Sequence, residues 1–259
     1  MARSNIKRLL KDIKNFQAEN YNLIISDFEP VSSWACYLKN IPCVALSNQA
    51  VIDLDQRVRN GKMNWLGRLI LMRYAPGTSK YGFHFDPASE NTYPPLIRPT
   101  VRAATTTDNG HITVYLPAYE DKKIIKHLSN FPETKFEVFS KHRSSEKGND
   151  HITLLPLNNE KFIASMATSH GIICGAGFET PSEALFMGKK LLVIPMSDQY
   201  EQQINASVLE KMGVTVLQKL KTGRADIASW IINGKVVEVD YPDRTQEIVD
   251  RIVACHAVR

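Results

Sequence analysis

The chain has 259 residues, of which 43% are hydrophobic and 23% are charged, and its net charge at pH 7 is +5. This length fits one large domain or two small ones, and the composition is ordinary for a globular protein. We expect no transmembrane helix, because no apolar run approaches the roughly 20 residues that one needs, and no secretory signal. The four cysteines show no metal-binding spacing, so we expect reduced thiols, no bound metal and a cytoplasmic protein.

The first half of the chain predicts a short parallel sheet. A strand, a helix and a strand follow one another within about 25 residues, which is typical of a βαβ unit. Only about three strands are expected here, too few for a parallel sheet with both faces covered, so we expect the first domain to be incomplete. The expected elements are a helix over 4–18, a strand over 22–26, a helix over 30–39, a strand over 42–46, a basic helix and a strand near 81–85.

The basic helix lies in a stretch with a strong charge bias. Residues 56–85 contain six lysines or arginines and no acidic residue, with apolar residues between them. One interpretation is an interfacial helix over 57–73 that faces anionic lipid. The other is a packed helix whose basic face is solvated. The sequence favours the second interpretation and leaves the first open.

A change of composition separates the two halves of the chain. Residues 86–110 contain four prolines and a polar run, which predicts a linker. We therefore expect a partial N-terminal domain over 1–100 and a second domain over 111–259. The second domain alternates strands and helices and predicts a complete doubly wound sheet. Its expected strands are 112–116, 135–139, 151–155, 170–174, 191–194 and 214–217, with helices between them and near 224–232 and 242–256.

The most informative stretch lies in the second domain, at residues 171–206. A buried strand runs into Gly175-Ala176-Gly177, and a helix follows at once. Such a turn brings N–H groups and the positive end of a helix to the carboxyl end of a strand, where a diphosphate can bind. Thr180 can add a hydroxyl, and we expect Glu179 to point away. A Gly-x-Gly turn alone is a weak signal and is equally typical of a tight βα connection.

Polar residues further along strengthen this interpretation. Glu183 lies about one turn into the helix, where a carboxylate can accept both hydroxyls of a ribose. The next strand ends at Pro195, and Gln199, Glu201, Gln202 and Gln203 follow, a set of amides and a carboxylate that suits sugar hydroxyls. Each could be a solvated helix residue by itself. Within one strand–helix–strand–helix frame they favour a nucleotide-sugar site.

The same stretch resembles the donor-binding signature of GT-B glycosyltransferases. It is similar to the UDP-glucuronosyl and plant-type transferases and to the GlcNAc transferase of peptidoglycan synthesis. The segments 25–30 and 46–49 also resemble the end of the N-terminal domain in such enzymes. The matching residues are Gly177, Ser182-Glu183, Gly188, Pro195, Glu201-Gln202 and Asn205-Ala206.

The resemblance implies a fold and a set of roles. The fold would be α/β and GT-B-like, with two Rossmann-like domains that have parallel sheets, the first one incomplete. The donor would be a nucleoside diphosphate sugar, with UDP as the expected nucleotide, and no cofactor or metal would be needed. The implied donor ligands are Gly175, Ala176, Gly177, Phe178 and Thr180 for the diphosphate, Glu183 for the ribose, and Glu201, Gln202 and Gln203 for the sugar.

The catalytic residue is not identified by the sequence. In the resembling family, a loop after the first strand supplies acceptor contacts and often a histidine, and that loop would precede residue 1. Asp27 and Glu29 follow a strand and are candidate acceptor-side groups, although solvated loop acids are the simpler interpretation. His84 is a candidate base, with an ordinary structural histidine as the alternative.

These inferences predict a glycosyltransferase that moves a sugar to an acceptor hydroxyl. The alternative is a donor-binding module or subunit that is inactive without an N-terminal segment or a partner chain. A nucleotide-sugar 2-epimerase is a third hypothesis, disfavoured because its first-domain catalytic groups are not evident. The acceptor is unknown; a lipid-linked acceptor at the inner face of the membrane would suit residues 57–73, and no nucleic acid partner is expected.

Overall fold

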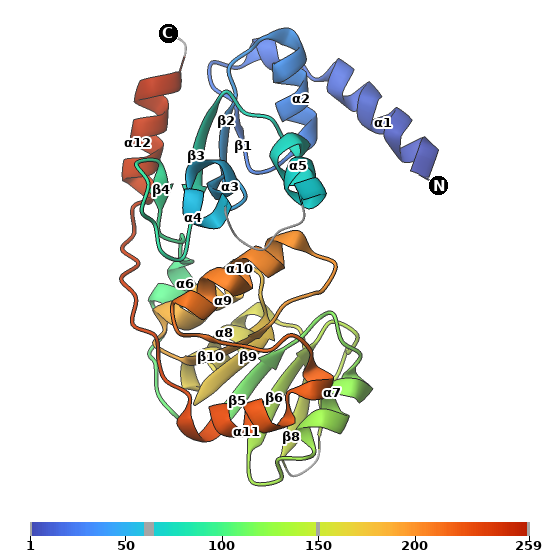
Figure 1. Ribbon diagram of the computed structural model, residues 1–259, viewed down its shortest axis with the longest axis vertical. Coiled ribbons are helices and arrows are strands. Elements are labelled where there is room, and N and C mark those ends of the chain that lie inside the picture. Colours follow the sequence, from blue (N-terminus) through green and yellow to red (C-terminus); the bar gives the residue numbers. More distant parts are fainter. Residues whose placement is uncertain (1, 60–64, 149–150, 258–259) are drawn as a thin grey trace. The chain divides into compact units, whose positions relative to one another are not determined.

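The chain forms two compact units in the computed structural model, which describes residues 2–59, 65–148 and 151–257. Unit 1 contains Met1–Leu96 together with Pro242–Arg259, and unit 2 contains Ile97–Tyr241. Figure 1 shows the elements of both units, coloured along the sequence. Each unit combines helices with a sheet of mainly parallel strands, which confirms the predicted α/β class.

Unit 1 is built on a four-stranded sheet in the order β1-β2-β3-β4, and all neighbouring strands are parallel. Strand β1 is very short and lies at the edge of this sheet. The elements of unit 1 are β1 (Ile25–Ser26), β2 (Val44–Ser47), β3 (Ser79–Phe83), β4 (Thr92–Tyr93), α1 (Ala2–Asn15), η1 (Ala18–Asn20), α2 (Pro30–Lys39), α3 (Val51–Leu54), α4 (Gln56–Arg59), α5 (Trp65–Tyr74) and α12 (Thr245–His256).

Helices cover both faces of this sheet. Successive residues of an extended strand point to opposite sides, so two consecutive buried residues can report on the two faces. Cys43 belongs to a buried cluster that also contains Cys36 of α2. The next residue, Val44, belongs to a different cluster that contains Ile248 and Ile252 of α12. The two helices that sandwich the first sheet therefore come from opposite ends of the chain.

The position of α12 corrects the expected domain division. We expected 111–259 to form one domain, but α12 packs on the sheet of unit 1. The Arg251 guanidinium donates to the Tyr93 hydroxyl at 3.0 Å and to the Glu90 carboxylate at 3.1 Å. These are contacts between residues far apart in the sequence, and no local pattern indicates them.

Residues 86–110 are also more than the expected linker. They contain strand β4, which extends the first sheet, and the short helix α6 (Pro99–Arg102). The division between the units falls inside them, since residues from Ile97 onward belong to unit 2. One proline there begins α6, and others end extended segments, so these prolines do not indicate an unstructured linker.

Unit 2 has a seven-stranded sheet in the order β11-β10-β9-β5-β6-β8-β7, in which only the short β7 pairs antiparallel. The six strands expected from the sequence are all present. The elements are β5 (His111–Tyr115), β6 (Lys135–Ser140), β7 (Lys147–Gly148), β8 (Ile152–Pro156), β9 (Gly171–Gly175), β10 (Lys190–Ile194), β11 (Thr215–Val216), α6, α7 (Asp121–Leu128), α8 (Asn159–Thr168), α9 (Glu179–Phe186), α10 (Tyr200–Lys211), η2 (Leu220–Thr222) and α11 (Arg224–Asn233).

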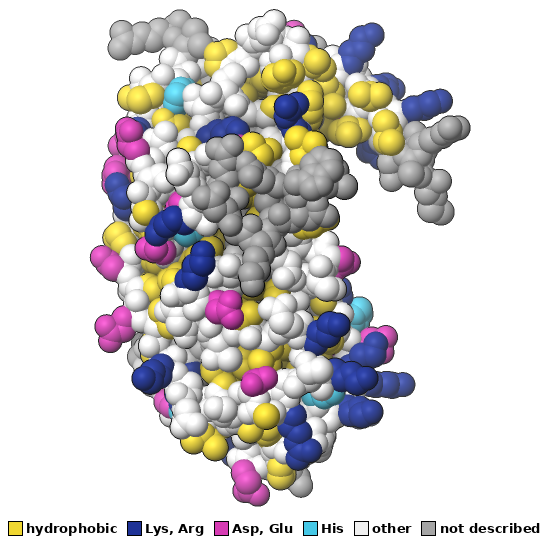
Figure 2. Space-filling view, viewed as in Figure 1, with side chains coloured by type: hydrophobic (Ala, Val, Ile, Leu, Met, Phe, Trp, Pro, Cys, Tyr) yellow, Lys and Arg dark blue, Asp and Glu magenta, His cyan; other side chains and the backbone are white. Residues whose placement is uncertain are grey.

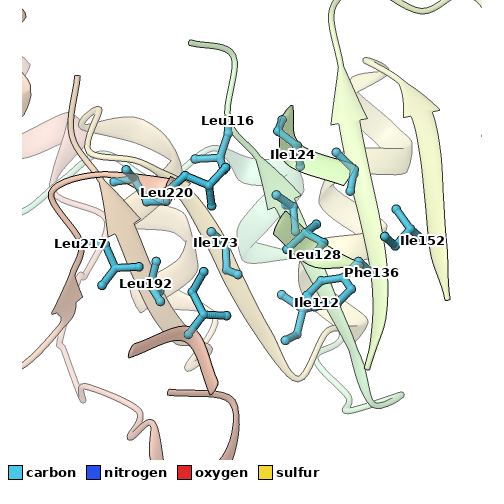
Figure 3. Packing of buried hydrophobic residues seen from close by; sticks show 14 of the residues in the cluster. Ile112, Leu116, Ile124, Leu128, Phe136, Ile152, Ile173, Leu192, Leu217 and Leu220 are labelled. Carbon is cyan, nitrogen blue, oxygen red and sulfur yellow. The ribbon is translucent and has the colours of Figure 1, made fainter. Parts of the chain in front are cut away.

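The second sheet is covered on both faces, as the alternation along β5 shows. Ile112 and Val114 join the buried cluster that includes residues of α7 and α11, part of which Figure 3 shows as sticks. Thr113 and Tyr115 point to the other face, where Thr113 bonds to Ser165 of α8 at 2.6 Å. A strand with apolar or satisfied polar residues on both sides is typical of a buried parallel sheet.

The strand order places the glycine turn at a reversal of the sheet. From β5 the chain proceeds outward through β6 and β8, and after α8 it returns to β9 on the other side of β5. Doubly wound sheets bind ligands at the carboxyl ends of their strands at such a reversal. Strand β9 ends at Gly175, so the Gly175-Ala176-Gly177 turn lies at this point.

The surface of unit 1 carries apolar side chains. Figure 2 shows hydrophobic residues gathered over α2, where Tyr37 is 60% exposed and Leu38 is 65% exposed. Ile25 of the edge strand β1 is also exposed. Within the residues that the structure describes, no helix has both the length and the apolar character to cross a membrane.

Candidate functional site

Strand β9, the turn and helix α9 form the centre of the candidate donor site. The strand is fixed by full burial of Ile172, Ile173 and Cys174. Helix α9 then begins without a side-chain hydrogen bond from its N-cap residue, Phe178. Side chains usually satisfy the first N–H groups of a helix, so an end without such a cap can bind an anion. The side chain of Glu179 is exposed.

The turn leaves room for a ligand beside its backbone. A Cβ atom added to Gly177 would meet no atom within 4 Å, so neighbouring side chains do not fill the space there. A Cβ atom added to Gly175 would lie 3.6 Å from the Gln202 Oε1 atom. The structure therefore brings Gln202, from the following helix, close to the turn.

Helix α10 is tied to the turn by a buried amide. Asn205 is 8% exposed, and its Nδ2 donates to the Ala176 carbonyl at 3.1 Å. This bond explains the Asn205-Ala206 pair in the sequence pattern: the asparagine holds the turn, and the buried alanine allows close packing. Asn205 is a positioning residue that the sequence did not assign to a role.

The amides at the start of α10 are held by the loop before it. Gln202 Oε1 accepts from the Met196 N–H at 3.0 Å, and Gln203 Nε2 donates to the Met196 carbonyl at 2.9 Å. Gln202 Nε2 donates to Gln199 Oε1 at 2.7 Å. Glu201 is half-buried. The side chains of this group are thus ordered near the carboxyl end of β10, where a donor sugar could contact them.

Glu183 is the most deeply buried charged residue of the site, and it is paired. Its side chain is 4% exposed. Arg98 donates from Nε to Oε1 at 2.5 Å and from Nη2 to Oε2 at 2.7 Å. Such a two-pronged pair fixes the plane of the carboxylate as well as its charge. The hydrogen bonds with Glu183 raise the pKa of Arg98 above its usual range.

Arg98 also connects Glu183 to the preceding βα unit. Its Nη1 donates to Asn159 Oδ1 at the start of α8. The guanidinium therefore bridges α8 and α9, which follow β8 and β9, two strands that are consecutive in the chain but not paired in the sheet. Sequence reasoning missed Arg98 because it precedes Glu183 by 85 positions and lies in the expected linker. No periodicity or motif signals such a pair.

The structure gives the Glu29 side chain a role in folding. Its carboxylate caps α2 by accepting from the Val31 N–H at 2.6 Å and from the Ser32 N–H at 2.7 Å. Partial burial raises the pKa of Glu29, but the hydrogen bonds from Ser32 and Val31 outweigh burial and leave that pKa below its ordinary value. The capping bonds therefore account for this residue.

The other first-unit candidates differ in their surroundings. Asp27 lies at the carboxyl end of β1, next to Phe28, which has a left-handed backbone with φ 53°. Such a conformation is rare for a bulky residue and occurs at functional loops. His84 is 7% exposed, its Nδ1 lies 2.7 Å from the Asp86 carbonyl, and burial lowers its pKa. His84 is therefore held neutral and shielded, which fits a structural histidine.

Much of the basic stretch over 57–73 lies outside the described residues, since residues 60–64 and several side chains of α5 are not described. Arg57 is already engaged: its guanidinium contacts Asp55 at 2.7 Å and Asp86 at 2.8 Å. Among the described side chains of α5, Leu69 is 44% exposed and Tyr74 is 46% exposed.

Comparison with known proteins identifies the family of this chain. The family model described as glycosyl transferase family 1 matches residues 1–233. The chain belongs to this family. No curated protein matches the sequence. The chain is thus a glycosyltransferase by family membership, and the predicted resemblance is confirmed.

Solved structures show that the glycosyltransferase has the GT-B fold. MurG from Acinetobacter baumannii is similar with a TM-score of 0.60 and 15% identity, over 96% of this chain and 78% of that one. The spinosyn rhamnosyltransferase SpnG, complexed with thymidine diphosphate, has a TM-score of 0.55 and 13% identity, over 98% and 75%. SnogD from Streptomyces nogalater has a TM-score of 0.52 and 14% identity, over 93% and 70%.

Proposed function

We propose that this glycosyltransferase moves a sugar from a nucleoside diphosphate donor, with UDP as the expected nucleotide, to an acceptor hydroxyl. The observation that carries the proposal is the position of the Gly175-Ala176-Gly177 turn. It lies at the reversal of the second sheet, beside the uncapped start of α9, with the buried carboxylate of Glu183 one turn further on. The similar structure of SpnG is a complex with thymidine diphosphate, which supports this class of donor.

In this proposal each part of the donor has its own partners. The backbone from Gly175 to Phe178 and the hydroxyl of Thr180 bind the diphosphate. Glu183 accepts the ribose hydroxyls with the lone pairs that Arg98 leaves open, because a carboxylate can accept about four hydrogen bonds. The side chains of Glu201, Gln202 and Gln203 bind the sugar.

The same geometry suits the departure of the diphosphate. As the bond to the sugar breaks, negative charge develops on the leaving diphosphate oxygen. Preorganised N–H groups and the positive end of α9 stabilise that charge in place without reorganising. The proposal therefore requires no metal and no cofactor. On the acceptor side Asp27 remains a candidate for the group that takes the acceptor proton, whereas the Glu29 carboxylate caps α2 and His84 is buried.

Donor binding is tested by thermal unfolding of the whole chain with a panel of UDP-, dTDP- and GDP-sugars. A ligand that binds only the folded state at about 100 times its Kd stabilises that state by about 2.7 kcal/mol. We expect one nucleotide class to raise the melting temperature by roughly 5–10 °C, given about 2–4 °C per kcal/mol for a protein of this size. The absence of a shift with every member of the panel would contradict the proposed donor site.

A second candidate function is donor binding alone. In this case the isolated chain binds the donor but transfers no sugar, and transfer requires a partner polypeptide. The observation that favours it is the first sheet, whose edge strand β1 has two residues and an exposed Ile25. Both candidates predict donor binding, so transfer is the discriminating measurement. Robust transfer of labelled sugar to an added acceptor by the isolated chain would exclude the second candidate.

We propose that the acceptor is lipid-linked and lies at the inner face of the membrane. It rests on α5, where Leu69 and Tyr74 are exposed and Arg73 is exposed beside them. The chain should float with vesicles that contain anionic lipid at low salt and should detach as salt rises, because the attraction is partly electrostatic. Equal recovery with neutral and anionic vesicles, or none with either, would contradict this statement.

A further inference from the structure

A second group of reactive side chains lies at the opposite end of the second sheet. Strand β9 ends at the donor turn and β10 ends beside it, whereas at their other ends Gly171 is paired to Lys190. There, Asp108, His170 and Lys190 line a cavity of about 220 Å³. None of these residues belongs to the donor site, and the proposed glycosyl transfer does not use them.

The three side chains form a continuous chain of short contacts. His170 Nδ1 lies 2.7 Å from Asp108 Oδ2, and Lys190 Nζ lies 2.8 Å from His170 Nε2. A carboxylate can only accept, so His170 Nδ1 carries a proton and donates it to Asp108. The remaining nitrogen, Nε2, then has its lone pair directed at the amine of Lys190. The hydrogen bond from His170 lowers the pKa of Asp108, which keeps that carboxylate charged.

This arrangement is the geometry of an activated nucleophile. A nucleophile within hydrogen-bond reach of a base, with the base oriented by a third group, is the common pattern of nucleophilic sites. The ammonium of Lys190 can pass a proton to His170 Nε2 along the existing hydrogen bond. Asp108 stabilises the imidazolium that results, so the neutral amine forms without losing its proton directly to water.

The backbone holds the group rigidly. The Gly188 backbone is left-handed, with φ 66°, and the Lys189 N–H donates to the Ala184 carbonyl at 3.0 Å, which ends α9 and turns the chain into β10. On the other side, the Asn109 N–H donates to the Thr168 carbonyl at 2.8 Å and fixes the segment that carries Asp108. Both halves of the group are therefore preorganised.

The preceding residue, Lys189, has different hydrogen-bond partners from Lys190. Lys189 is 6% exposed, and its Nζ donates to the carbonyls of Thr107 at 2.6 Å and Ser169 at 2.9 Å. Carbonyl oxygens accept hydrogen bonds but do not take the proton, so Lys189 has no basic partner, although it lines the same pocket. Two consecutive lysines thus have opposite chemical environments, one structural and one with a basic partner.

We propose that Lys190 is a site of covalent modification by small activated acyl groups, specifically thioesters, with His170 as its base and Asp108 as the group that orients that base. The pocket is an open depression of about 220 Å³, which leaves room for a short acyl group such as acetyl beside Lys190. Asp108 is 56% exposed and His170 is 33% exposed, so the carrier thiol can stay in solvent.

The step balances as an acyl transfer without redox change. One proton of the Lys190 ammonium passes to His170 Nε2 and then to solvent. The amine nitrogen attacks the thioester carbon, a C–N bond forms, and the C–S bond breaks as the thiolate leaves. The second proton passes from the tetrahedral adduct to His170, which gives it to the thiolate. The products are an uncharged amide at Lys190 and a free thiol.

The test is the time course of acetylation of the whole chain by S-acetyl-N-acetylcysteamine, a small thioester, read residue by residue by peptide mass spectrometry. The exposed Lys122, Lys123 and Lys126 of α7 serve as internal references. We expect Lys190 to react at least about tenfold faster than these lysines, a threshold set below the factor of 10²–10⁴ that a positioned base contributes. Lys189 should remain unmodified. An excess below about tenfold in the wild-type chain would overturn the proposal, whatever the variants do.

A matched variant separates base catalysis from simple exposure. Glutamine at position 170 preserves a polar side chain but cannot take a proton, so His170→Gln should remove the excess rate at Lys190. The reference lysines in the same sample report whether the fold is intact, since their rates should not change. If the Lys190 excess survives in His170→Gln while the reference rates are unchanged, the assignment of the base is wrong. Glycosyl transfer and donor binding are separate readouts, so their loss or presence does not affect this outcome.

Discussion

Glu183→Ala removes the stabilisation of the glycosyltransferase by its nucleotide-sugar donor. Two hydrogen bonds from ribose hydroxyls to a charged carboxylate are lost, each with a contribution of about 1.5–3 kcal/mol. A total loss of about 3 kcal/mol lowers donor affinity by roughly 100-fold. A donor concentration of about 100 times the wild-type Kd then only equals the Kd of the variant. The remaining stabilisation is about 0.4 kcal/mol, or roughly 1 °C in melting temperature.

The same helix offers a matched control for this variant. Glu179 has the same charge and starts α9, but its side chain is exposed and has no place in the proposed ribose site. Glu179→Ala should keep the full donor-induced shift, and loss of its negative charge near the diphosphate should not weaken binding. The two variants are compared by melting curves with and without donor. A full donor shift in Glu183→Ala would exclude Glu183 as the ribose ligand.

The elements of unit 2 could be predicted because their sequence signals are local. A buried apolar run such as Ile172–Cys174, a small-residue turn and a Pro after the next strand define a βα repeat without knowledge of the rest of the chain. The family resemblance implied that Gly175 and Gln202 belong to one site, and the structure places them close together.

The contacts between distant residues could not be predicted in this way. The assignment of α12 to unit 1 depends on Ile248 and Ile252, whose helical spacing indicates an apolar face but not its partner. Strand β4 has only two residues, Thr92 and Tyr93, within a segment rich in prolines, so it lacks any strand period. Composition alone predicts a linker for such a segment.

Arg98 is the clearest example of a contact between distant residues. Its replacement is expected to lower both stability and donor affinity. Arg98→Met keeps most of the apolar stem but leaves the buried Glu183 carboxylate without its partner. Loss of one member of a buried pair reduces stability by about 3–5 kcal/mol. Because the Arg98 side chain is 43% exposed and water can replace part of its interaction, we expect a smaller loss of about 1–2 kcal/mol.

Donor binding should fall as well, since Arg98 fixes the plane of the carboxylate that accepts the ribose. We expect the donor Kd, measured by titration calorimetry, to rise by about tenfold, which corresponds to about 1.4 kcal/mol. Arg98→Lys should recover part of the stability through its charge but less of the affinity, because an ammonium cannot form the two-pronged contact. An unchanged Kd in Arg98→Met would show that the pair serves folding alone.

Arg102, the arginine at the end of α6, provides the control. Arg102 donates to the Tyr241 carbonyl at 2.8 Å and lies 4.9 Å from the centre of the Phe186 ring, without contact to Glu183. Arg102→Met should therefore reduce stability and leave the donor Kd unchanged. This comparison distinguishes a general weakening of unit 2 from an effect transmitted through the carboxylate.

The double variant Arg98→Met with Glu183→Gln separates the two contributions of the pair. A glutamine is uncharged, so its burial without Arg98 avoids the penalty of an unpaired charge, and stability should return toward that of the wild type. Donor affinity should stay low, because a neutral amide is a weaker acceptor for ribose hydroxyls than a carboxylate. Recovery of the melting temperature together with continued loss of donor binding would show that donor recognition needs the Arg98–Glu183 pair itself and not only the stability that the pair supplies.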